Sequence, residues 1–337
     1  MDWFERLTGF REDGYQATRD RLRVEDGVLH SLVNGRRYGV GVLEFASLGD
    51  LRQRASATPR GTRGLRVGNL TGDVGALHSD PAYAGALFQV ASQFNLLEMA
   101  APRLTPEDGV AIYASDPTQG PACAIAAGAA TIYRNYFVPV DGVPGQTRDR
   151  QLDGLAGIGA ALGAELGVAP DILWTMQNGY ALCTKSGLAR IAAHLDGLDE
   201  AARDRLRAKL RIGFHRDVEV TRQDAPSAQR VSQAFCSAMP VAYCPHERAL
   251  WQPLARLVLE AAYEATLCAA LVNARAGGSR RVVLTRLGGG AFGNADAWID
   301  AAMRRALHIA RDTDLDVAIL SWGEPPRSMI DLAAEFG

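Results

Sequence analysis

The sequence lacks long apolar runs, a large net charge and paired cysteines. No stretch of the 337 residues approaches the roughly 18 uninterrupted apolar residues of a membrane-spanning helix, so we expect no membrane span. The N-terminal residues 1–6 are acidic and have none of the apolar core of a signal peptide. The 36 Lys and Arg residues against 38 Asp and Glu give a net charge of −2, so no global basic field favours nucleic acid as a partner.

The cysteines argue against a disulfide framework and against a zinc site. Their number is odd, and none of them has the Cys-x-x-Cys spacing of a metal site or a redox motif. We therefore expect reduced thiols and a cytoplasmic protein. The six histidines are scattered without metal-ligand spacing, so we predict neither a metal nor a cofactor. The cysteines are Cys123, Cys183, Cys236, Cys244 and Cys268.

The remaining composition is that of an ordinary globular protein, with 47% apolar and 22% charged residues. From about residue 65 onward, predicted strands and helices alternate, which is typical of an α/β layered sheet. Residues 1–60 are strand-rich, and we expect them to form an N-terminal extension packed on a core domain of residues 61–337. Basic residues are almost all Arg, and Ala and Gly are abundant, which suggests a GC-rich bacterial genome.

Several helices and strands are predicted from apolar spacing. Residues 83–99 are predicted to be a helix, because Leu87, Val90, Phe94 and Leu97 form one apolar stripe. Residues 110–114 are predicted to be a strand and residues 122–137 an alanine-rich helix. Residues 247–276 are predicted to be one long helix, and Ile172–Leu182 a strand, turn and strand around Asn178-Gly179.

A glycine-rich loop near the end of the chain organises the functional prediction. Val282–Leu284 is a short aliphatic strand, residues 288–290 and 293 are glycines, and an amphipathic helix follows. A strand, a glycine turn and a helix N-terminus together form a cradle for phosphate, because backbone N–H groups can approach an anion closely. The predicted anion-binding residues are Gly288, Gly289, Gly290, Ala291, Phe292, Gly293 and Asn294.

Gly288, Gly290 and Gly293 also satisfy the Gly-x-Gly-x-x-Gly pattern of dinucleotide-binding folds. The position argues against that interpretation, because such a fold usually begins with this unit and needs several strands after it. Only one helix and one strand fit after this loop, and that strand ends in Ser321-Trp322-Gly323 instead of the acid that would bind ribose. A glycine turn without any ligand is the other alternative, although three consecutive glycines are costly in backbone entropy.

The residues from Val282 to Asn294, together with the later strand Leu315–Leu320, resemble the C-terminal part of macrodomains. The similarity is greatest to the branch that includes poly(ADP-ribose) glycohydrolase-like proteins. It implies a three-layer α/β/α fold with a mixed sheet, in which this loop wraps the diphosphate of ADP-ribose. Gln93 can be laid on the Gln of the Gln-Glu-Glu signature of the glycohydrolases, but Phe94 and Asn95 replace the two glutamates. The glycine run that precedes the signature is also absent.

The chain is also similar to a divergent set of Legionella-type effectors that remove ADP-ribose from ubiquitin, in which we expect aspartates to carry the chemistry. Cleavage of an ADP-ribosyl bond builds positive charge at the anomeric carbon, so it needs carboxylates beside the sugar. The resemblance implies a protein that binds ADP-ribose or ADP-ribosylated protein. Catalytic candidates are Asp73, Asp80 and Glu98, and further ligand-binding candidates are Asn69, Gln89, Gln93, Asn95, Asp116 and Gln119.

Three alternatives remain open at this point. The same pocket would serve a reader module that binds ADP-ribose without cleaving it, which the missing glutamates permit. An enzyme acting on another NAD-derived nucleotide would need the same phosphate loop. A thiol nucleophile at Cys236, with His215 or His246 as its base, is disfavoured because a cysteine in an apolar strand is usually inert.

Overall fold

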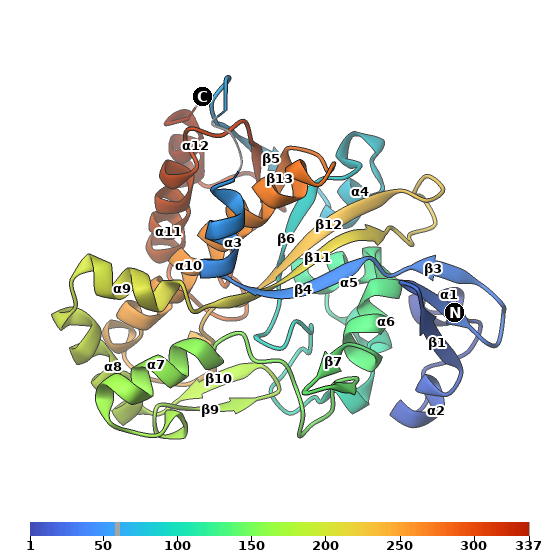
Figure 1. The fold of residues 1–337 in the computed structure, drawn as a ribbon, viewed down its shortest axis with the longest axis horizontal. Helices are drawn as coiled ribbons and strands as arrows, with labels where there is room; N and C mark the ends of the chain where they lie inside the picture. The colour runs from blue at the N-terminus through green and yellow to red at the C-terminus, as the bar shows by residue number, and fades with distance from the viewer. Residues whose placement is uncertain (58–60, 337) are drawn as a thin grey trace.

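A seven-stranded mixed sheet forms the centre of the computed structural model, which describes residues 1–57 and 61–336 (Figure 1). The five strands from β12 to β5 run parallel, whereas β11 and β4 are antiparallel to their neighbours at one edge. The predicted mixed sheet is therefore confirmed. In spatial order, the strands are β4 (Val42–Ser47), β11 (Arg211–Glu219), β12 (Arg230–Cys236), β6 (Leu87–Ala91), β13 (Arg281–Leu284), β14 (Asp316–Ser321) and β5 (Arg66–Thr71).

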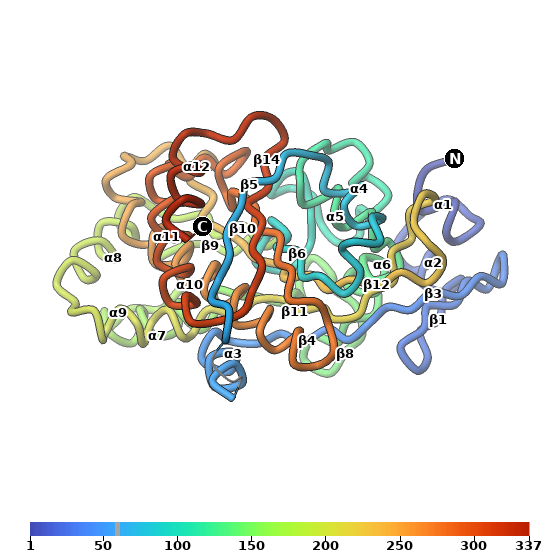
Figure 2. The backbone as a smooth tube through the Cα atoms, turned by 90° about the horizontal axis from the view of Figure 1, so that it is seen from above, coloured from blue at the N-terminus to red at the C-terminus, as the bar shows by residue number. Residues whose placement is uncertain are grey.

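Helices cover both faces of the sheet and complete the three layers (Figure 2). Alternate residues of each parallel strand face opposite layers: Val282 and Leu284 belong to one apolar cluster, and Val283 to the other. One layer contains α3 (Leu48–Ala55), α10 (Arg248–Arg275), α11 (Asp296–Ile309) and α12 (Arg327–Ala334). The other contains α4 (Val74–Ser79), α5 (Gln119–Ala126) and α6 (Gly128–Tyr136).

Helix α10 is long and apolar enough to cross a membrane by length and composition alone. In its most apolar window, however, 83% of the residues are buried inside the protein. It packs between α3, α8 and α11, and it supplies much of the larger apolar cluster. Its apolar surface is therefore accounted for by the core of this fold.

A smaller lobe packs beside α10 (Figure 1), and its Tyr180 lines the candidate site. The predicted strand, turn and strand around Asn178-Gly179 are confirmed as the hairpin of β9 and β10. Gly179 has a φ of +78° and Asn178 a φ of +47°, as a tight hairpin turn requires. The lobe contains α7 (Ala156–Leu166), β9 (Trp174–Gln177), β10 (Tyr180–Cys183), α8 (Lys185–Gly197) and α9 (Glu200–Arg207).

The helix predicted over residues 83–99 is wrong. The chain forms strand β6 at Leu87–Ala91, and an irregular turn follows it. Leu87, Phe88 and Val90 are all fully buried, because β6 lies in the middle of the sheet and both of its faces are covered. A short strand that is apolar on both faces cannot be distinguished from a buried helix by periodicity alone.

Two further predictions in this part of the chain are corrected. The strand predicted over residues 110–114 is the 3-10 helix η3 (Ala111–Ser115). The helix predicted over residues 122–137 is divided at Ala127, whose φ of −115° and ψ of 58° separate α5 from α6. At this break the N–H of Gly128 donates to Thr221 Oγ1 instead of continuing the helix.

The N-terminal residues form a unit of their own as far as residue 39, and then the chain enters the central sheet. The elements of this unit are α1 (Trp3–Thr8), α2 (Tyr15–Arg19), β1 (Leu22–Glu25), β2 (Val28–Ser31) and β3 (Arg37–Gly39). They share a separate apolar cluster with α6 and η3. Residues 42–55 belong to the main layers, because β4 pairs with β11 and α3 packs on α10. The central sheet therefore starts before residue 60, where we expected the N-terminal extension to end.

The Glu12 carboxylate attaches this unit to the segment that leads to the candidate site. It accepts hydrogen bonds from the N–H groups of Val110 (2.9 Å) and Ala111 (2.6 Å) and from the Tyr136 hydroxyl (2.7 Å). Val110 and Ala111 stand at the start of η3, and Asp116 directly follows its last residue. The N-terminal unit therefore supports the candidate site indirectly.

We expect Glu12→Ala to lower the free energy of unfolding by about 2–4 kcal/mol, because it leaves buried donors without an acceptor. Urea denaturation measures this change. Glu25→Ala, at an exposed position of β1, is the control and should change stability by less than about 0.5 kcal/mol. Equal effects of the two substitutions would show that Glu12 does not fasten the unit.

Candidate functional site

The candidate site lies where the sheet divides between β6 and β13. Only Val282 and Val283 of β13 pair with β6. Beyond this point the two strands diverge, and the N–H of Thr285 donates to the side-chain oxygen of Gln89 (3.3 Å) instead of to the β6 backbone. The division occurs at the carboxyl ends of parallel strands, where open α/β sheets bind their ligands.

Two glutamine side chains satisfy the backbone groups that the division exposes. Gln119 accepts from the N–H of Ala91 (3.0 Å) and donates to the carbonyl of Gln89 (2.8 Å). The Gln89 side chain is fully buried and donates to Thr266 Oγ1 (2.9 Å). The structure therefore places the predicted ligand-binding residue Gln89 inside the sheet as a structural group. Gln119 likewise holds the backbone of β6, although it also lines the cavity.

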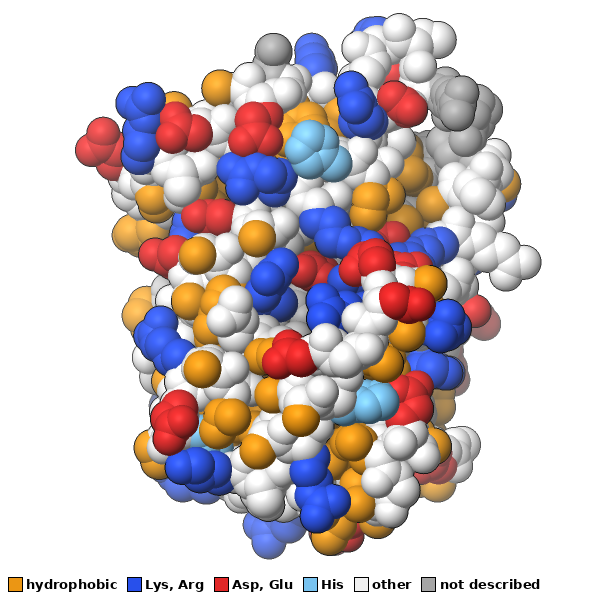
Figure 3. Space-filling model, turned by 90° about the vertical axis from the view of Figure 1, so that its left-hand side faces the viewer, with side chains coloured by type: hydrophobic (Ala, Val, Ile, Leu, Met, Phe, Trp, Pro, Cys, Tyr) orange, Lys and Arg blue, Asp and Glu red, His pale blue; other side chains and the backbone are white. Residues whose placement is uncertain are grey.

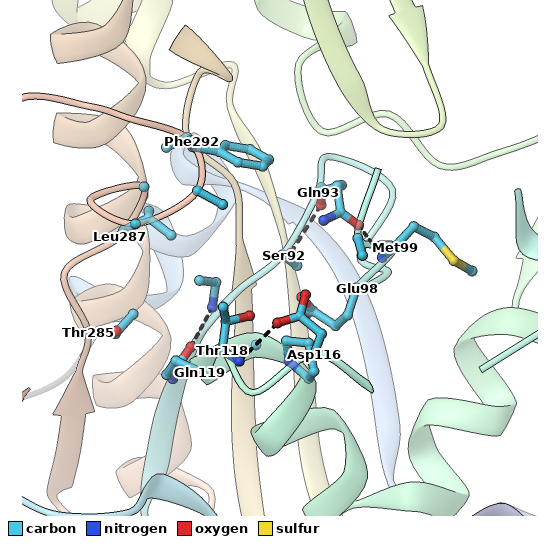
Figure 4. Close-up of a pocket in the computed structure, with 18 of the residues that line it drawn as sticks. Ser92, Gln93, Glu98, Met99, Asp116, Thr118, Gln119, Thr285, Leu287 and Phe292 are labelled. Carbon is cyan, nitrogen blue, oxygen red and sulfur yellow. Dashed lines mark hydrogen bonds between the residues drawn. The ribbon is translucent and has the colours of Figure 1, made fainter. Parts of the chain in front are cut away.

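The resulting cavity is lined by the turn that follows β6, the start of α5 and the glycine-rich loop (Figure 4). Its volume of about 180 Å³ is smaller than a typical ligand pocket, which has roughly 300–1,000 Å³. A second cavity of about 350 Å³ adjoins it and shares Thr118, Gln119, Thr285 and Arg286 with it. A ligand of nucleotide size would therefore have to occupy both.

The glycine-rich loop keeps its shape because of two left-handed residues and one buried amide. Gly288 (φ +74°) and Gly293 (φ +70°) adopt conformations that other residues rarely take. The buried Asn294 side chain donates to the carbonyls of Met239 (2.8 Å) and Gly288 (3.2 Å). Gly288, Gly290, Ala291 and Phe292 line the cavity, whereas Gly289, Gly293 and Asn294 lie outside its lining.

The turn after β6 is held by the side chains of Gln93 and Asn95. Gln93 accepts from the N–H of Met99 (2.8 Å), and Asn95 accepts from the N–H of Leu97 (3.1 Å). Leu96, the residue after Asn95, has a φ of +66°. Of the two predicted ligand-binding residues, Gln93 lines the cavity, whereas Asn95 is fully buried and donates to Gln151 (2.8 Å). The turn presents Glu98 to the cavity.

The carboxyl group of Glu98 makes no hydrogen bond to any of the described residues. It is 3% exposed, and its Oε1 has no hydrogen-bond partner among the described residues. Burial raises the pKa of Glu98 well above the ordinary value, the Arg134 charge opposes this shift, and the nearby Asp116 adds to it. Glu98 therefore favours its protonated form more than an exposed carboxyl group does.

Asp116 lines the same cavity and lies next to Glu98 (Figure 4). Its Oδ1 accepts the N–H of Thr118 (2.9 Å), which fixes the carboxylate before the first turn of α5. Gly120 in that turn permits the close approach, because a Cβ there would collide with the Ala91 carbonyl and the Glu98 carboxyl. The site thus contains two neighbouring carboxyl groups, a pattern typical of acid–base catalysis.

The other predicted catalytic carboxylates lie elsewhere. Asp73 caps α4 by accepting the N–H of Gly75 (2.8 Å), and its neighbours Gly72 and Val74 line the second cavity. Asp80 is exposed and accepts the N–H of Ala82 (2.8 Å). Arg281 of β13 donates a hydrogen bond to the Ala82 carbonyl, which places Asp80 near the start of β13. This is the opposite edge of the sheet from the site. The prediction that Asp80 is catalytic is therefore corrected.

Asn69 is also placed outside the site. It lies inside β5, two strands away from the glycine-rich loop, and donates to the Met329 carbonyl (3.1 Å). The strand β5 continues to Thr71, so Asn69 does not lie in the loop that follows the strand. Its amide connects β5 to α12 and does not reach either cavity.

The structure adds residues that the sequence did not indicate. Arg286 lines both cavities and pairs with Asp296 (2.5 Å) and Asp300 (3.2 Å) of α11. Trp322 lines the second cavity and is 78% exposed, the highest exposure of any described large hydrophobic residue after Met1. The position of Arg286 next to the glycine-rich loop could have indicated that it lines the site. Trp322 follows a strand and belongs to no motif that would have indicated it.

Phe292 forms an aromatic wall with two residues from other segments. Its ring centroid lies 5.3 Å from Tyr180 of β10 and 5.7 Å from Tyr243. The Tyr180 hydroxyl donates to the Met99 carbonyl (2.6 Å), which ties this wall to the turn that carries Glu98. All three rings line the cavity, so Phe292 is both packed and available to a ligand.

Thiol and metal chemistry receive no support from the geometry. Burial raises the pKa of Cys236 to about 12, and neither His215 nor His246 is hydrogen-bonded to it. All five cysteines are buried with free thiols. Within residues 1–57 and 61–336, no group of three or more His, Cys, Asp or Glu side chains is arranged to hold a metal ion.

No protein-family model and no curated protein matches the chain. Among solved structures, the chain is similar to poly(ADP-ribose) glycohydrolase from Thermomonospora curvata, with 13% identity and a TM-score of 0.43 over 95% of this chain and 94% of that chain. It is also similar to the Deinococcus radiodurans poly(ADP-ribose) glycohydrolase crystallised with ADP-ribose, with 13% identity and a TM-score of 0.43 over 97% of both chains.

We expect Glu98→Gln to stabilise the protein increasingly as the pH rises. A carboxyl group whose pKa is higher in the folded than in the unfolded state costs stability from about pH 4 up to its folded pKa, at about 1.4 kcal/mol per pKa unit. Urea denaturation at pH 4.5 and pH 8 should show an advantage of the variant that grows by at least about 1 kcal/mol. The exposed Glu324→Gln is the control, and parallel pH dependences would contradict the prediction.

Proposed function

We propose that this protein binds ADP-ribose and hydrolyses the bond that joins it to a protein. The observation that carries this proposal is the cavity with Glu98 and Asp116 on one wall and the glycine-rich loop on the other (Figure 4). A phosphate cradle facing a pair of carboxyl groups suits a phosphorylated sugar whose anomeric carbon is attacked.

The pyrophosphate is assigned to the loop from Gly288 to Phe292. Backbone N–H groups in a glycine-rich turn approach an anion closely. Arg286, at the junction of the two cavities, adds the positive charge that this loop otherwise lacks. Its two carboxylate partners on α11 keep the guanidinium in place until a ligand arrives.

The adenine base is assigned to the second cavity. Trp322 offers an exposed aromatic face there, and Pro117, Leu320 and Pro326 supply further apolar surface. Asp73 lies between two residues that line this cavity, so its carboxylate is a suitable acceptor for an exocyclic amine. In this arrangement Asp73 recognises the ligand and does not act on the bond that is cleaved.

The two carboxyl groups divide the chemistry between them. Glu98, which favours protonation, donates its proton to the leaving atom of the acceptor as the bond to the anomeric carbon breaks. Asp116 accepts a proton from the water whose oxygen bonds to that carbon, and its charge stabilises the cationic sugar. The products are free ADP-ribose and the unmodified acceptor.

Two rivals remain, together with the question of the acceptor. A reader module would bind ADP-ribose with the same loop but release nothing, and an enzyme for another NAD-derived nucleotide would bind plain ADP as tightly as ADP-ribose. The carboxyl pair favours turnover over reading. Ubiquitin is the first acceptor protein to test, on the sequence resemblance alone.

We expect Glu98→Gln and Asp116→Asn each to reduce the release of ADP-ribose from modified protein by at least about 100-fold. Binding of free ADP-ribose, measured by calorimetry, should change less than about threefold, because neither residue is assigned to the phosphates. Glu324→Gln is again the control. Wild-type protein that binds ADP-ribose without releasing it from any modified protein would leave only the reader.

We expect Gly290→Val to weaken ADP-ribose binding by at least about 30-fold without loss of stability. Gly290 lines the cavity, its φ is not in the left-handed range, and an added Cβ would have nothing within 4 Å. The new side chain is therefore accommodated in the free protein but obstructs the anion. Gly197→Val, at another open glycine far from the site, should leave binding unchanged. Unchanged binding by Gly290→Val would remove the pyrophosphate from this loop.

A further inference from the structure

Arg134 of α6 is a buried cation without a carboxylate in contact. Its side chain is 1% exposed, and no carboxylate of the described residues lies within 4.0 Å of its guanidinium. The other arginine buried to this degree, Arg207, pairs with Glu200 (2.7 Å) and Glu260 (2.7 Å). Burying a charge without such a partner is expensive, so the position of Arg134 requires a reason.

The guanidinium of Arg134 makes neutral contacts on all sides. Nε donates to the Leu96 carbonyl (3.2 Å), and Nη2 donates to Thr131 Oγ1 (2.9 Å). Nη1 lies 3.3 Å from His215 Nδ1, and the Phe235 ring centroid lies 3.7 Å from the guanidinium carbon. The contact with Leu96 reaches the turn that presents Glu98, at its residue with a φ of +66°.

His215 does not compete for this charge. Burial and the Arg134 cation lower the pKa of His215 well below the ordinary value, so the imidazole stays neutral. Because Nδ1 accepts from Arg134, the ring carries its proton on Nε2. Burial also lowers the pKa of Arg134, to about 10, which still leaves the guanidinium protonated at neutral pH.

We propose that Arg134 is a positioning residue for Glu98: its hydrogen bond to the Leu96 carbonyl fixes the turn, and its charge lies behind the Glu98 carboxyl. This inference rests on the proposed role of Glu98 as the catalytic acid. It assigns Arg134 no contact with the ligand, because Arg134 does not line the cavity.

Among the described residues that face Glu98, Arg134 is the one group whose positive charge opposes the rise of the Glu98 pKa. Asp116, in the segment after η3, carries a negative charge that repels the Glu98 carboxylate. The neutral groups are the hydroxyl of Tyr113 on η3, the thiol of Cys123 on α5 and the hydroxyl of Tyr180 on β10, and burial raises the pKa of each of them. Without the Arg134 cation, burial and the Asp116 charge would raise the Glu98 pKa with no opposing charge among the described residues.

Two variants separate the charge from the hydrogen bonds. Arg134→Met removes both, so the pKa of Glu98 should rise further and the turn should loosen. Arg134→Lys keeps a positive charge. A lysine ammonium group lacks the planar fork of a guanidinium, so it cannot contact the Leu96 carbonyl, Thr131 and His215 at the same time. The pKa of Glu98 should then change little, while the rate falls.

The decisive measurement is the titration of Glu98 by carbon NMR on protein labelled at its glutamate carboxyl groups, with Glu98→Gln identifying the signal. Arg134→Met should raise the midpoint by at least about one pH unit, whereas Arg207→Met, the matched buried arginine, should leave it unchanged. An unchanged Glu98 midpoint in Arg134→Met would overturn the charge effect.

Rates test the positioning effect and protect against a variant that fails to fold. Arg134→Lys should lower kcat by at least about tenfold with little change in KM, and wild-type kcat in this variant would overturn the positioning role. In Arg134→Met, the alkaline limb of the plot of kcat/KM against pH should shift to higher pH together with the Glu98 midpoint. If the wild-type protein releases no ADP-ribose, the proposed function fails, while the NMR titration still decides the effect of Arg134 on Glu98.

Discussion

The interrupted ladder between β6 and β13 is the constraint on which the site depends. Two strands that stay paired to their ends leave no room between them, whereas here pairing stops after Val283. The Ala91 N–H and the Gln89 carbonyl of β6 are satisfied by the side chain of Gln119, so the division leaves these two backbone groups paired. The glycine-rich loop and the Glu98 turn can therefore diverge and enclose a cavity at the carboxyl edge of the sheet.

The polar groups around this cavity differ in how completely they are paired. Gln89, Asn95 and Asn294 use their side-chain amides to hold strands and turns, as buried amides usually must. Among the described residues, the buried Oε1 of Glu98 has no hydrogen-bond partner, and neither has the buried Oδ1 of Asn294. Glu98 differs from Asn294 in lining the cavity, where a ligand can supply the missing partner.

Charge on the rest of the molecule is balanced locally. On the face shown in Figure 3, basic and acidic side chains are interspersed without a large patch of one sign. Arg52 and Arg305 pair with Asp204 and Glu264, which connects α3, α9, α10 and α11. Glu264 is almost fully buried and both arginines are half-buried, so these ion pairs fasten the helices to one another away from the candidate site.

The sequence by itself determined the layered α/β class, the long core helix and the strand–glycine-loop–helix unit, because these depend on local periodicity and on backbone conformations that only glycine adopts readily. It did not determine the segment from residue 83 to 99, because a strand buried on both faces carries no alternation. Only the tertiary structure decided which carboxyl groups meet: the turn after β6 and the segment before α5 bring Glu98 and Asp116 together, whereas Asp80, a catalytic candidate in the sequence, lies at the opposite edge of the sheet. Proximity between residues far apart in the chain is set by strand order, and strand order leaves no local trace in the sequence.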